Sequence, residues 1–341
     1  MEQIIPKKAI SVEHNWQKEL SKSFTDPSKL LSYLHLDEKN YEQHMKARRL
    51  FPMRVPRHFV ELMEKGNPND PLLLQVMPLS DEFLTSPHYN EDPLEEHNTA
   101  GKGLLHKYDS RVLLMVRTGC AVNCRYCFRR HFPYAENAVS KAQWTETLSY
   151  IANNPDINEV IFSGGDPLMA KDDHLAWLAS EIAAIDHVKR LRIHTRLPVV
   201  LPERICSAFE DWFTALPIQK VLVLHANHEN EVSDALIDAL APLRGKGVTL
   251  LNQSVLLKGI NDNADAICAL NERLFEAGVL PYYLHVLDKV QGASHFYVSD
   301  DDARAIMEQA IKRLPGFLVP KLVREIGGQP GKTPIDLHLH P

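Results

Sequence analysis

The segment RVLLMVRTGCAVNCRYCFRR, residues 111–130, decides the fold. It opens with an apolar run rich in β-forming side chains and then carries three cysteines within eight residues. An apolar run of this length predicts a buried strand, and the polar, glycine-containing stretch after it predicts a loop. We therefore expect a strand from Val112 that delivers the three cysteines to one edge of a sheet.

Similar β-rich runs recur along the chain at intervals of roughly 30 residues or more, which is the size of one βα unit. They begin at Val112, Val160, Leu191, Val221, Val248 and Tyr282. Stretches with helical periodicity lie between them, at 141–153, 172–185, 202–215, 231–244 and 263–277, and a further one at 299–314 precedes an apolar segment at 317–323. Six such units in series predict an α/β fold with a parallel sheet, either open or closed into a barrel.

Prolines divide the first third of the chain into short pieces, as in FPMRVP at 51–56 and NPNDP at 67–71. Proline ends helices and favours turns, so we expect a mostly helical N-terminal region that wraps the core. We find no signature of chemistry in it. The predicted organisation is this region at 1–105, a core at 106–316 and a C-terminal segment at 317–341.

The overall composition is that of an ordinary globular protein, with 44% hydrophobic and 24% charged residues, and it excludes a disordered chain. A net charge of −6 offers no positive field to a nucleic acid. No apolar run reaches the roughly 18 residues that span a bilayer, and we read no secretory signal at the start. Five cysteines, three of them clustered, suit metal binding better than disulfides, so we expect a cytoplasmic protein.

Side chains that can bind or titrate follow every predicted strand. In chain order these groups are Cys120–Cys127, Ser163–Asp166, His194–Arg196, His225–His228, Asn252–Ser254 and Asp288. Loops are polar in general, which explains one or two such groups but not six in succession. The carboxyl ends of parallel strands build the active sites of α/β barrels, so we expect a site at this edge.

Cys120, Cys124 and Cys127 are the strongest chemical signal, because three thiolates on one short loop are typical of a metal site. Zinc would need a fourth protein ligand, and no further cysteine or histidine stands at a suitable spacing. A 4Fe–4S cluster usually takes four cysteines, so three leave one iron open to a small molecule. We expect Cys206 and Cys268 to be small core residues inside helices.

The glycine-rich stretch GGQPGKT at 327–333 has two chemical interpretations. A phosphate-binding Walker loop is excluded, because Ile326 stands where that motif needs glycine and no helix can follow. The other is a lysine, Lys332, that forms a Schiff base with pyridoxal phosphate (PLP). From these residues alone, a surface lysine in a flexible tail is the simpler interpretation.

The C-x3-C-x2-C spacing, with an aromatic residue before the last cysteine, resembles the radical S-adenosylmethionine (SAM) superfamily. SGGDP at 163–167 is similar to the motif that contacts the SAM amino group in that superfamily. Together, seven segments in order resemble the lysine 2,3-aminomutase family, which adds PLP to radical SAM chemistry. They are RVLLMVRTGCAVNCRYCFRR, VIFSGGDPL, HTRLPVVLPERI, HANHENE, NQSVLLKGIND, PYYLHVLDKVQGASHF and GGQPGK.

The resemblance implies a partial (β/α)6 barrel and three cofactors, which are a 4Fe–4S cluster, SAM and PLP. Cys120, Cys124 and Cys127 would bind the cluster, and Lys332 would bind PLP. In the family, a radical made from SAM removes hydrogen from the substrate β-carbon, nitrogen migrates from C2 to C3 while PLP delocalises the spin, and SAM is regenerated. The implied cofactor-binding residues are Ser163, Gly164, Gly165 and Asp166 for SAM, and Arg111, Arg196, His225, Asn227, His228, Asn252, Gln253 and Ser254 for polar groups of PLP or SAM.

The resemblance also implies how a substrate is held. Arg129 matches the family arginine that binds the substrate carboxylate. Asp288 and Glu325 match two acids that bind the ε-ammonium of lysine, with Glu325 in place of an aspartate. Two carboxylates attract a cationic end group and repel an acidic one, so L-lysine is favoured over glutamate as substrate, and arginine stays open.

These features resemble the compact bacterial subgroup that makes (R)-β-lysine for attachment to elongation factor P. The implied partners are a reductant protein such as flavodoxin and an elongation factor P ligase. Longer family members carry C-terminal cysteines that bind zinc between subunits. This sequence has no cysteine after Cys268, so we expect no such zinc and infer no oligomeric state.

Two other functional classes stay open at this point. A non-catalytic Fe–S protein that transfers electrons would need neither Lys332 nor the carboxylate pair of Asp288 and Glu325. An ordinary PLP enzyme with a structural metal would be active in air and indifferent to loss of the cysteines.

Overall fold

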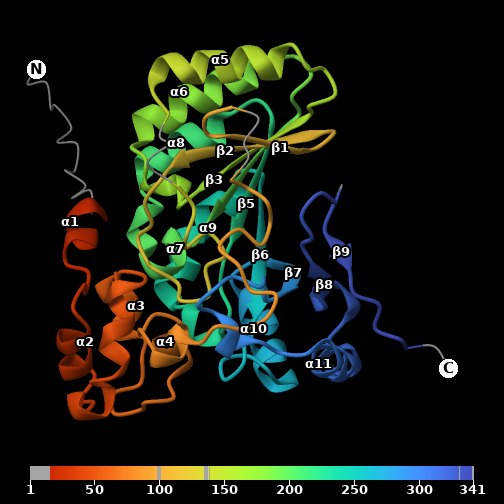
Figure 1. Cartoon of the computed structure of the whole chain (residues 1–341). Coiled ribbons are helices and arrows are strands. Elements are labelled where there is room, and N and C mark those ends of the chain that lie inside the picture. Colours follow the sequence, from red (N-terminus) through yellow and green to blue (C-terminus); the bar gives the residue numbers. More distant parts are fainter. Residues whose placement is uncertain (1–15, 98–100, 134–136, 138, 330, 340–341) are drawn as a thin grey trace, which may run out of the picture.

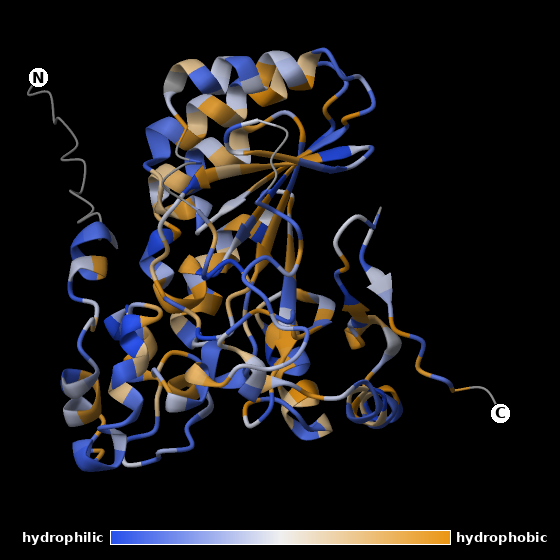
Figure 2. Cartoon of the chain, in the orientation of Figure 1, coloured by the Kyte–Doolittle hydropathy of each residue, from blue (hydrophilic) through white to orange (hydrophobic). Residues whose placement is uncertain are grey.

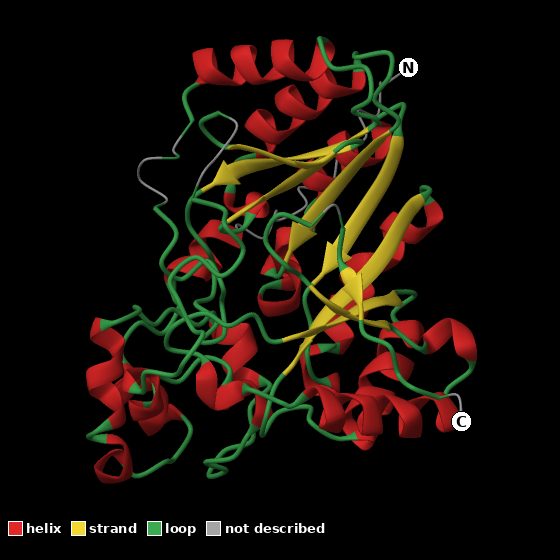
Figure 3. Cartoon of the chain, turned by 45° about the vertical axis from the view of Figure 1, so that its right-hand side comes forward, coloured by secondary structure: helices red, strands yellow, loops and turns green. Residues whose placement is uncertain are grey.

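Within the residues that the structure describes, a twisted sheet of nine strands organises the fold, and its strands neighbour one another in chain order from β1 to β9 (Figures 1 and 3). The computed structural model describes residues 16–97, 101–133, 137, 139–329 and 331–339. The strands are β1 Leu104–Tyr108, β2 Arg111–Arg117, β3 Glu159–Gly164, β4 Arg190–Thr195, β5 Gln219–Leu224, β6 Val248–Leu256, β7 Leu280–Val286, β8 Lys321–Arg324 and β9 Thr333–Pro334.

The strands from β2 to β8 run parallel, and antiparallel β1 and β9 end the sheet on either side, so the barrel is open. The six strands expected from sequence correspond to β2–β7, and a partial barrel of TIM type is confirmed. Three strands, β1, β8 and β9, were not expected, although β8 overlaps the apolar segment noted at 317–323. β1 forms because Tyr108 turns directly back to pair with Arg111, and the boundary drawn at residue 105 falls inside it.

Helices follow the parallel strands and cover the outer face of the sheet (Figure 1). They are α5 Lys141–Ala152, α6 Asp172–Ala183, α7 Leu197–Val200, α8 Ser207–Ala215, α9 Asp234–Gly245, α10 Ala264–Glu276 and α11 Asp300–Arg313. Polar residues cap their starts. Ser140 and Gln143 form a reciprocal capping box at α5, and Asn263 caps α10. The apolar faces of these helices and of the strands form the core (Figure 2).

Short 3₁₀ helices occupy many of the connections. They are η1 Glu38–Tyr41, η2 His44–Arg49, η3 Ser80–Phe83, η4 Pro167–Met169, η5 Pro202–Arg204, η6 Glu229–Glu231, η7 Ser294–Phe296 and η8 Gly316–Leu318. Cys268 lies inside α10 and is buried, as expected. Cys206 packs, partly buried, against the core, but it precedes α8 as its N-cap instead of lying inside a helix, and its thiol lies 3.8 Å from an Asp172 oxygen.

The N-terminal region consists of short helices, α1 Trp16–Ser21, α2 Pro27–Tyr33, α3 Arg57–Glu61 and α4 Pro71–Leu74 (Figure 1). Prolines start α2 and α4, where a missing N–H costs nothing, and aspartates cap both. This region packs against the cysteine loop. Glu82 accepts hydrogen bonds at 2.5 Å from Arg125 and Arg130, and all three side chains are almost fully buried.

Within the described part of the chain, no helix is long and apolar enough to cross a membrane.

Candidate active site

A cavity of about 530 Å³ opens where the parallel strands end. Its lining draws on the loops after β2, β3, β4 and β5, on β6 and β7, and on the C-terminal segment. It brings together most of the residues that the sequence analysis singled out. These are Arg111, Cys120, Cys124, Cys127, Arg129, Ser163, Gly164, Gly165, Asp166, Arg196, His225, Gln253, Ser254, Asp288, Glu325 and Lys332.

Three predicted cofactor-binding residues, Asn227, His228 and Asn252, lie outside this lining and make contacts within the protein. The Asn252 amide exchanges hydrogen bonds with the backbone N–H and carbonyl of Ala226. The His228 ring caps η6. Asn227 accepts from the backbone N–H of Val255 at 2.8 Å. Their geometry is that of residues that shape the loops around the cavity.

The cysteine loop follows β2 and is partly buried at the three thiols. Burial, and then repulsion by the neighbouring cysteine thiolates, raises the pKa of Cys127 to about 11 and that of Cys120 well above its usual value. Thiolates crowded in this way need a cation, and metal binding supplies one. Among the described residues, no three His, Cys, Asp or Glu side chains converge on one ion. A 4Fe–4S cluster fits better, because each thiolate binds a different iron.

The glycine pair after β3 lets the chain pass close to this loop. Gly164 has a positive φ of 124°, and a Cβ on Gly165 would lie 2.6 Å from the Gly119 carbonyl oxygen. The Gly165 N–H donates to the Arg117 carbonyl and the Asp166 N–H to that of Gly119. We expected the glycines to admit a ligand, and the structure shows that they admit the cysteine loop.

The Asp166 carboxylate is used within the protein. It accepts hydrogen bonds from the hydroxyl of Thr195 at 2.7 Å and from the backbone N–H groups of Leu168, Arg196 and Leu197. These bonds fix the loop after β4 against the turn after β3. A contact between Asp166 and SAM stays a prediction that this geometry does not favour.

Arg129 stands two residues after the last cysteine, and its guanidinium is held on two sides. Its Nε and Nη2 donate to the two oxygens of Glu96 at 2.6 and 3.1 Å. Its Nη1 donates to the Ser163 hydroxyl and the Gly164 carbonyl at 3.1 and 3.3 Å. Glu96 also accepts from Lys107 at 2.9 Å. Burial alone would raise the pKa of Glu96, but Arg129 and Lys107 outweigh it and keep the pKa low.

Lys332 extends from the turn before β9 into the cavity, where its Nζ lies 2.5 Å from Glu325 Oε2. The other Glu325 oxygen accepts from the Tyr108 hydroxyl at 3.2 Å and lies 3.9 Å from Lys107 Nζ. Burial opposes ionisation of Glu325, but Lys332 and Lys107 hold its pKa below the usual value. For Asp288, burial and the charge of Glu325 raise the pKa to about 7.

Three histidines in the cavity lining are kept neutral by burial, and the charge of Lys332 lowers the pKa of each further. Burial lowers the pKa of His225 to about 3, and it holds the pKa of His194 and His285 well below the usual value. Arg111 lies nearby, with its guanidinium carbon 4.0 Å from the ring centre of Tyr108.

Several buried polar atoms in this lining have no hydrogen-bond partner within the described residues. They are Arg192 Nε, His194 Nε2, Arg196 Nε, Gln253 Oε1 and His285 Nε2. Native proteins rarely leave buried polar atoms unpaired, so this set indicates a polar ligand. The cavity volume and this donor and acceptor set fit the polar groups of SAM and PLP, and Lys332 lines the same cavity.

The sequence analysis missed Glu96, Lys107 and Tyr108, which line the cavity, and Gln75, which contacts Arg196. No signature of chemistry was found in residues 1–105, yet the structure places Glu96 from this region in the cavity lining and Gln75 against Arg196. Lys107 and Tyr108 stand in GLLHKY at 103–108, a segment that is weakly similar to the family and could have indicated them, whereas Glu96 lies outside it. Gln75 had none, because its partners lie more than a hundred residues away.

The chain is similar to known proteins over nearly its whole length. The model of the radical SAM superfamily matches residues 115–270. The L-lysine 2,3-aminomutase of Escherichia coli (strain K12) is 56% identical over 326 residues, covering 95% of each chain. The L-lysine 2,3-aminomutase of Haemophilus influenzae is 52% identical over 332 residues, covering 97% of this chain and 98% of its own. That of Clostridium subterminale is 31% identical over 325 residues, 94% of this chain and 78% of its own. The chain therefore belongs to the lysine 2,3-aminomutase family of radical SAM enzymes, which are isomerases that use a 4Fe–4S cluster, SAM and PLP.

Proposed function

We propose that this enzyme converts L-α-lysine to β-lysine, in the R form, by moving the α-amino group from C2 to C3. One observation carries the proposal: a single cavity holds a guanidinium, Arg129, and two carboxylates, Asp288 and Glu325. A diamino acid presents a carboxylate and a distant ammonium, and these groups complement both. The family assignment supports the same substrate.

At the carboxylate end, we propose that Arg129 binds the substrate through its Nη edge. The Nε edge is committed to Glu96, whereas the Nη1 contacts with Ser163 and Gly164 are the longer ones. A guanidinium accepts a carboxylate in a planar, two-point geometry that lysine cannot reproduce. Glu96 would then orient the fork.

At the ammonium end, the ion pair between Lys332 and Glu325 supports the proposal that these carboxylates bind the substrate ammonium. The Nζ of Lys332 is itself a primary ammonium, 2.5 Å from Glu325. Once Nζ is bonded to PLP, it would no longer present a free ammonium with three N–H donors to Glu325. Glu325 and Asp288 would then receive the ε-ammonium of the substrate.

The three thiolates of Cys120, Cys124 and Cys127 would hold the cluster, and Lys332 would hold PLP. When bound, the cluster and SAM supply a 5′-deoxyadenosyl radical that removes hydrogen, and PLP spreads the unpaired electron during nitrogen migration. The chain contributes a buried setting with neutral histidines at His194, His225 and His285. Such a wall offers hydrogen bonds without adding positive charge.

The test is an anaerobic assay with reconstituted protein, SAM, PLP and dithionite, supplied separately with L-lysine, L-arginine and L-glutamate. Chiral chromatography should find (R)-β-lysine from lysine and no β-amino acid from glutamate. A product from arginine alone would move the substrate to arginine. A retained cluster with no 5′-deoxyadenosine from any substrate would favour an electron-transfer protein.

We infer further that the product is used to modify elongation factor P through a ligase, and that a low-potential protein such as flavodoxin supplies the electron. The inference rests on the resemblance to the compact bacterial subgroup. It is supported by the higher identity to the E. coli and H. influenzae relatives, 56% and 52%, than to the Clostridium enzyme, 31%. Mass spectrometry of elongation factor P from a strain that lacks the enzyme should show loss of a β-lysyl modification. An unchanged mass would contradict this role.

A further inference from the structure

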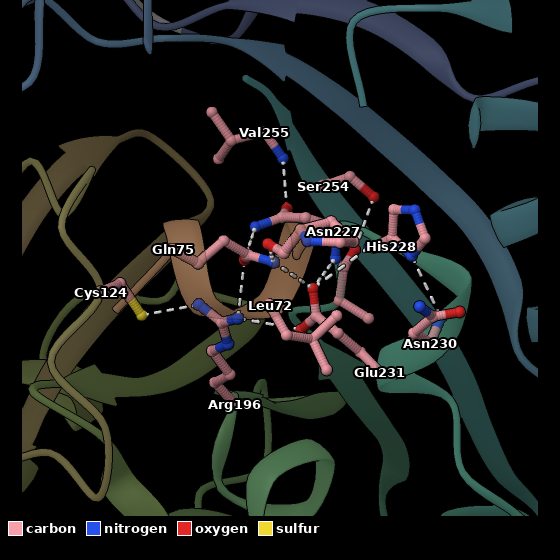
Figure 4. A network of polar contacts seen from close by, with 12 residues as sticks. Leu72, Gln75, Cys124, Arg196, Asn227, His228, Asn230, Glu231, Ser254 and Val255 are labelled. Carbon is pink, nitrogen blue, oxygen red and sulfur yellow. Dashed lines mark hydrogen bonds and ion pairs between the residues drawn. The ribbon is translucent and has the colours of Figure 1, made fainter. Parts of the chain in front are cut away.

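A buried polar network lies behind the cysteine loop and joins segments that are far apart in sequence (Figure 4). We call it the Arg196 network and define it as Gln75, Cys124, Tyr126, Arg196, Asn227 and Glu231. Gln75 and Glu231 have no exposed surface, and Arg196 is 6% exposed. These charges are therefore almost entirely removed from solvent, and their positions are set by contacts within the protein.

The guanidinium of Arg196 is directed at the sulfur of a cysteine. Its Nη1 lies 2.8 Å from Cys124 Sγ and also donates to the Tyr126 hydroxyl. Its Nη2 donates to Gln75 Oε1 at 2.8 Å and to Glu231 Oε2 at 2.9 Å. Two acceptors on Nη2 thus fix the orientation that brings Nη1 to the sulfur.

Glu231 is itself held in place from several sides. Its Oε1 accepts from the Gln75 amide at 2.9 Å and from the backbone N–H groups of Asn227 and His228 at 2.9 and 3.2 Å (Figure 4). Gln75 contacts both Arg196 and Glu231, so it holds the two side chains in position relative to each other. Gln75 is the C-cap of α4, in the N-terminal region.

We propose that Arg196 donates a hydrogen bond to the sulfur of Cys124 in the cluster-loaded enzyme and thereby raises the reduction potential of the cluster, with Gln75 and Glu231 as positioning residues. The proposal rests on the proposed function in one respect, that Cys124 binds the cluster. Reduction adds one electron from an external donor such as dithionite, and no bond forms or breaks. A guanidinium at a ligand sulfur stabilises the added negative charge, and burial strengthens this effect.

Packing alone does not account for the burial of the ion pair between Arg196 and Glu231. A buried ion pair costs desolvation that apolar side chains of similar size would avoid. The pair formed by Arg196 and Glu231 also leaves Arg196 Nε without a partner among the described residues. What the pair achieves is a cation fixed beside one thiol of the cysteine loop.

The test is the midpoint potential of the cluster, measured by redox titration with electron paramagnetic resonance on holoprotein without SAM, PLP or substrate. The main variant is Arg196→Gln with Glu231→Gln, which removes both charges of the pair together. At the wild-type midpoint, the ratio of reduced to oxidised cluster should fall about tenfold, or about 59 mV for a one-electron couple. Gln75→Met removes no charge and should cause a smaller fall in the same direction.

The matched control is Arg204→Gln with Asp172→Asn. Arg204 also forms a buried pair, at 2.9 Å from Asp172, and its Nη1 lies 3.9 Å from Cys206 Sγ, but neither charge lines the cavity. The cluster of this control variant should have the midpoint potential of the wild type. A wild-type midpoint in the Arg196 and Glu231 variant with full iron content would overturn the proposal. If that variant fails to hold a cluster, Gln75→Met decides, and an unchanged midpoint there overturns it.

This measurement does not depend on turnover. Failure of β-lysine formation with a shifted midpoint would count against the proposed function only. A normal product with unshifted midpoints would count against the role of the Arg196 network only.

Discussion

Lys332 has two proposed roles in this site. Its Nζ would bind PLP, and its ammonium lies where we expect the ammonium of the substrate. Its ion pair with Glu325 at 2.5 Å keeps that carboxylate ionised despite burial. Attachment of PLP to Nζ would convert this free ammonium into a nitrogen with at most one N–H. The same residue would thus bind the cofactor and leave the two carboxylates available to the substrate ammonium.

Replacing this residue gives the first prediction. Lys332→Ala should lose the visible absorption of bound PLP while keeping the iron and sulfide content of the wild type. Loss of β-lysine formation should be complete, because PLP has no anchor. Lys312→Ala, at an exposed lysine paired with Glu308, is the control and should leave the PLP absorption and the iron and sulfide content unchanged. An unchanged PLP spectrum in Lys332→Ala would remove the lysine from the cofactor site.

The raised pKa of Asp288 predicts that lysine binding depends on pH. Burial and the charge of Glu325 raise its pKa to about 7, so the carboxylate forms between pH 6 and 8. Lysine binding to PLP-loaded protein without reductant should strengthen about tenfold over this range, following the ionised fraction. Calorimetry on Asp288→Asn should show weaker binding with this dependence lost. A wild-type affinity that is flat from pH 6 to 8 would contradict the role of Asp288.

The raised pKa of Asp288 also makes the free energy of unfolding depend on pH. Because the folded state holds the Asp288 proton more tightly than the unfolded chain, its contribution is fully present below about pH 4. It declines as the pH rises and is lost above about pH 7. Asp288→Asn should therefore flatten this part of the stability profile, by an amount on the order of 4 kcal/mol.

At the scale of elements, the site depends on how closely two loops approach each other. The turn after β3 lies against the cysteine loop, and Gly165 is where they meet, with 2.6 Å available between a Cβ and the Gly119 oxygen. The Asp166 carboxylate then ties the same turn to the loop after β4. Three strand ends are thus locked together beside the thiols.

A methyl group at that point should disturb the cysteine loop. Gly165→Ala should destabilise the protein by about 1–3 kcal/mol, the usual range for overpacking, and lower the iron bound per chain. Gly245→Ala is the control, because a Cβ there meets nothing within 4 Å. Iron analysis after anaerobic reconstitution, with urea unfolding of the apoprotein, measures both effects. Full iron occupancy in Gly165→Ala would show that the close approach is not needed.

The sequence predicts the elements well where the pattern is repetitive. Alternation of apolar β-rich runs with helical stretches located β2–β7, since each unit repeats the same physical pattern. It did not locate β1, whose five residues depend on pairing with β2, or the two-residue β9. A strand that short has too little hydrophobic pattern of its own.

At the scale of the whole molecule, the N-terminal region supports the site rather than merely covering the core. Glu82 neutralises both Arg125 and Arg130, which flank the last two cysteines, and none of the three side chains is more than 1% exposed. Gln75 reaches Glu231 across 156 residues of chain. Such long-range pairs have no local signal, so the sequence predicts the cysteines but not what holds them.

The buried ion triad can be tested directly. Glu82→Gln should destabilise the protein by about 3–5 kcal/mol, because it leaves two buried guanidiniums without a counter-charge. Glu308→Gln, which removes an exposed pair with Lys312, should cost less than about 1 kcal/mol. Urea unfolding of both variants makes the comparison. Equal losses in the two would mean that the triad contributes no more than a surface pair.

The most direct test of the aminomutase assignment follows the nitrogen itself. The substrate is L-lysine labelled with ¹⁵N at the α-amino group and ¹³C at C2 and C3, mixed with unlabelled lysine and incubated anaerobically with the holoenzyme. The account predicts a β-lysine product in which ¹⁵N is bonded to ¹³C3 of the same molecule, seen as a one-bond coupling by nuclear magnetic resonance. Recovery of ¹⁵N only at C2, with SAM cleaved and the cluster intact, would contradict it.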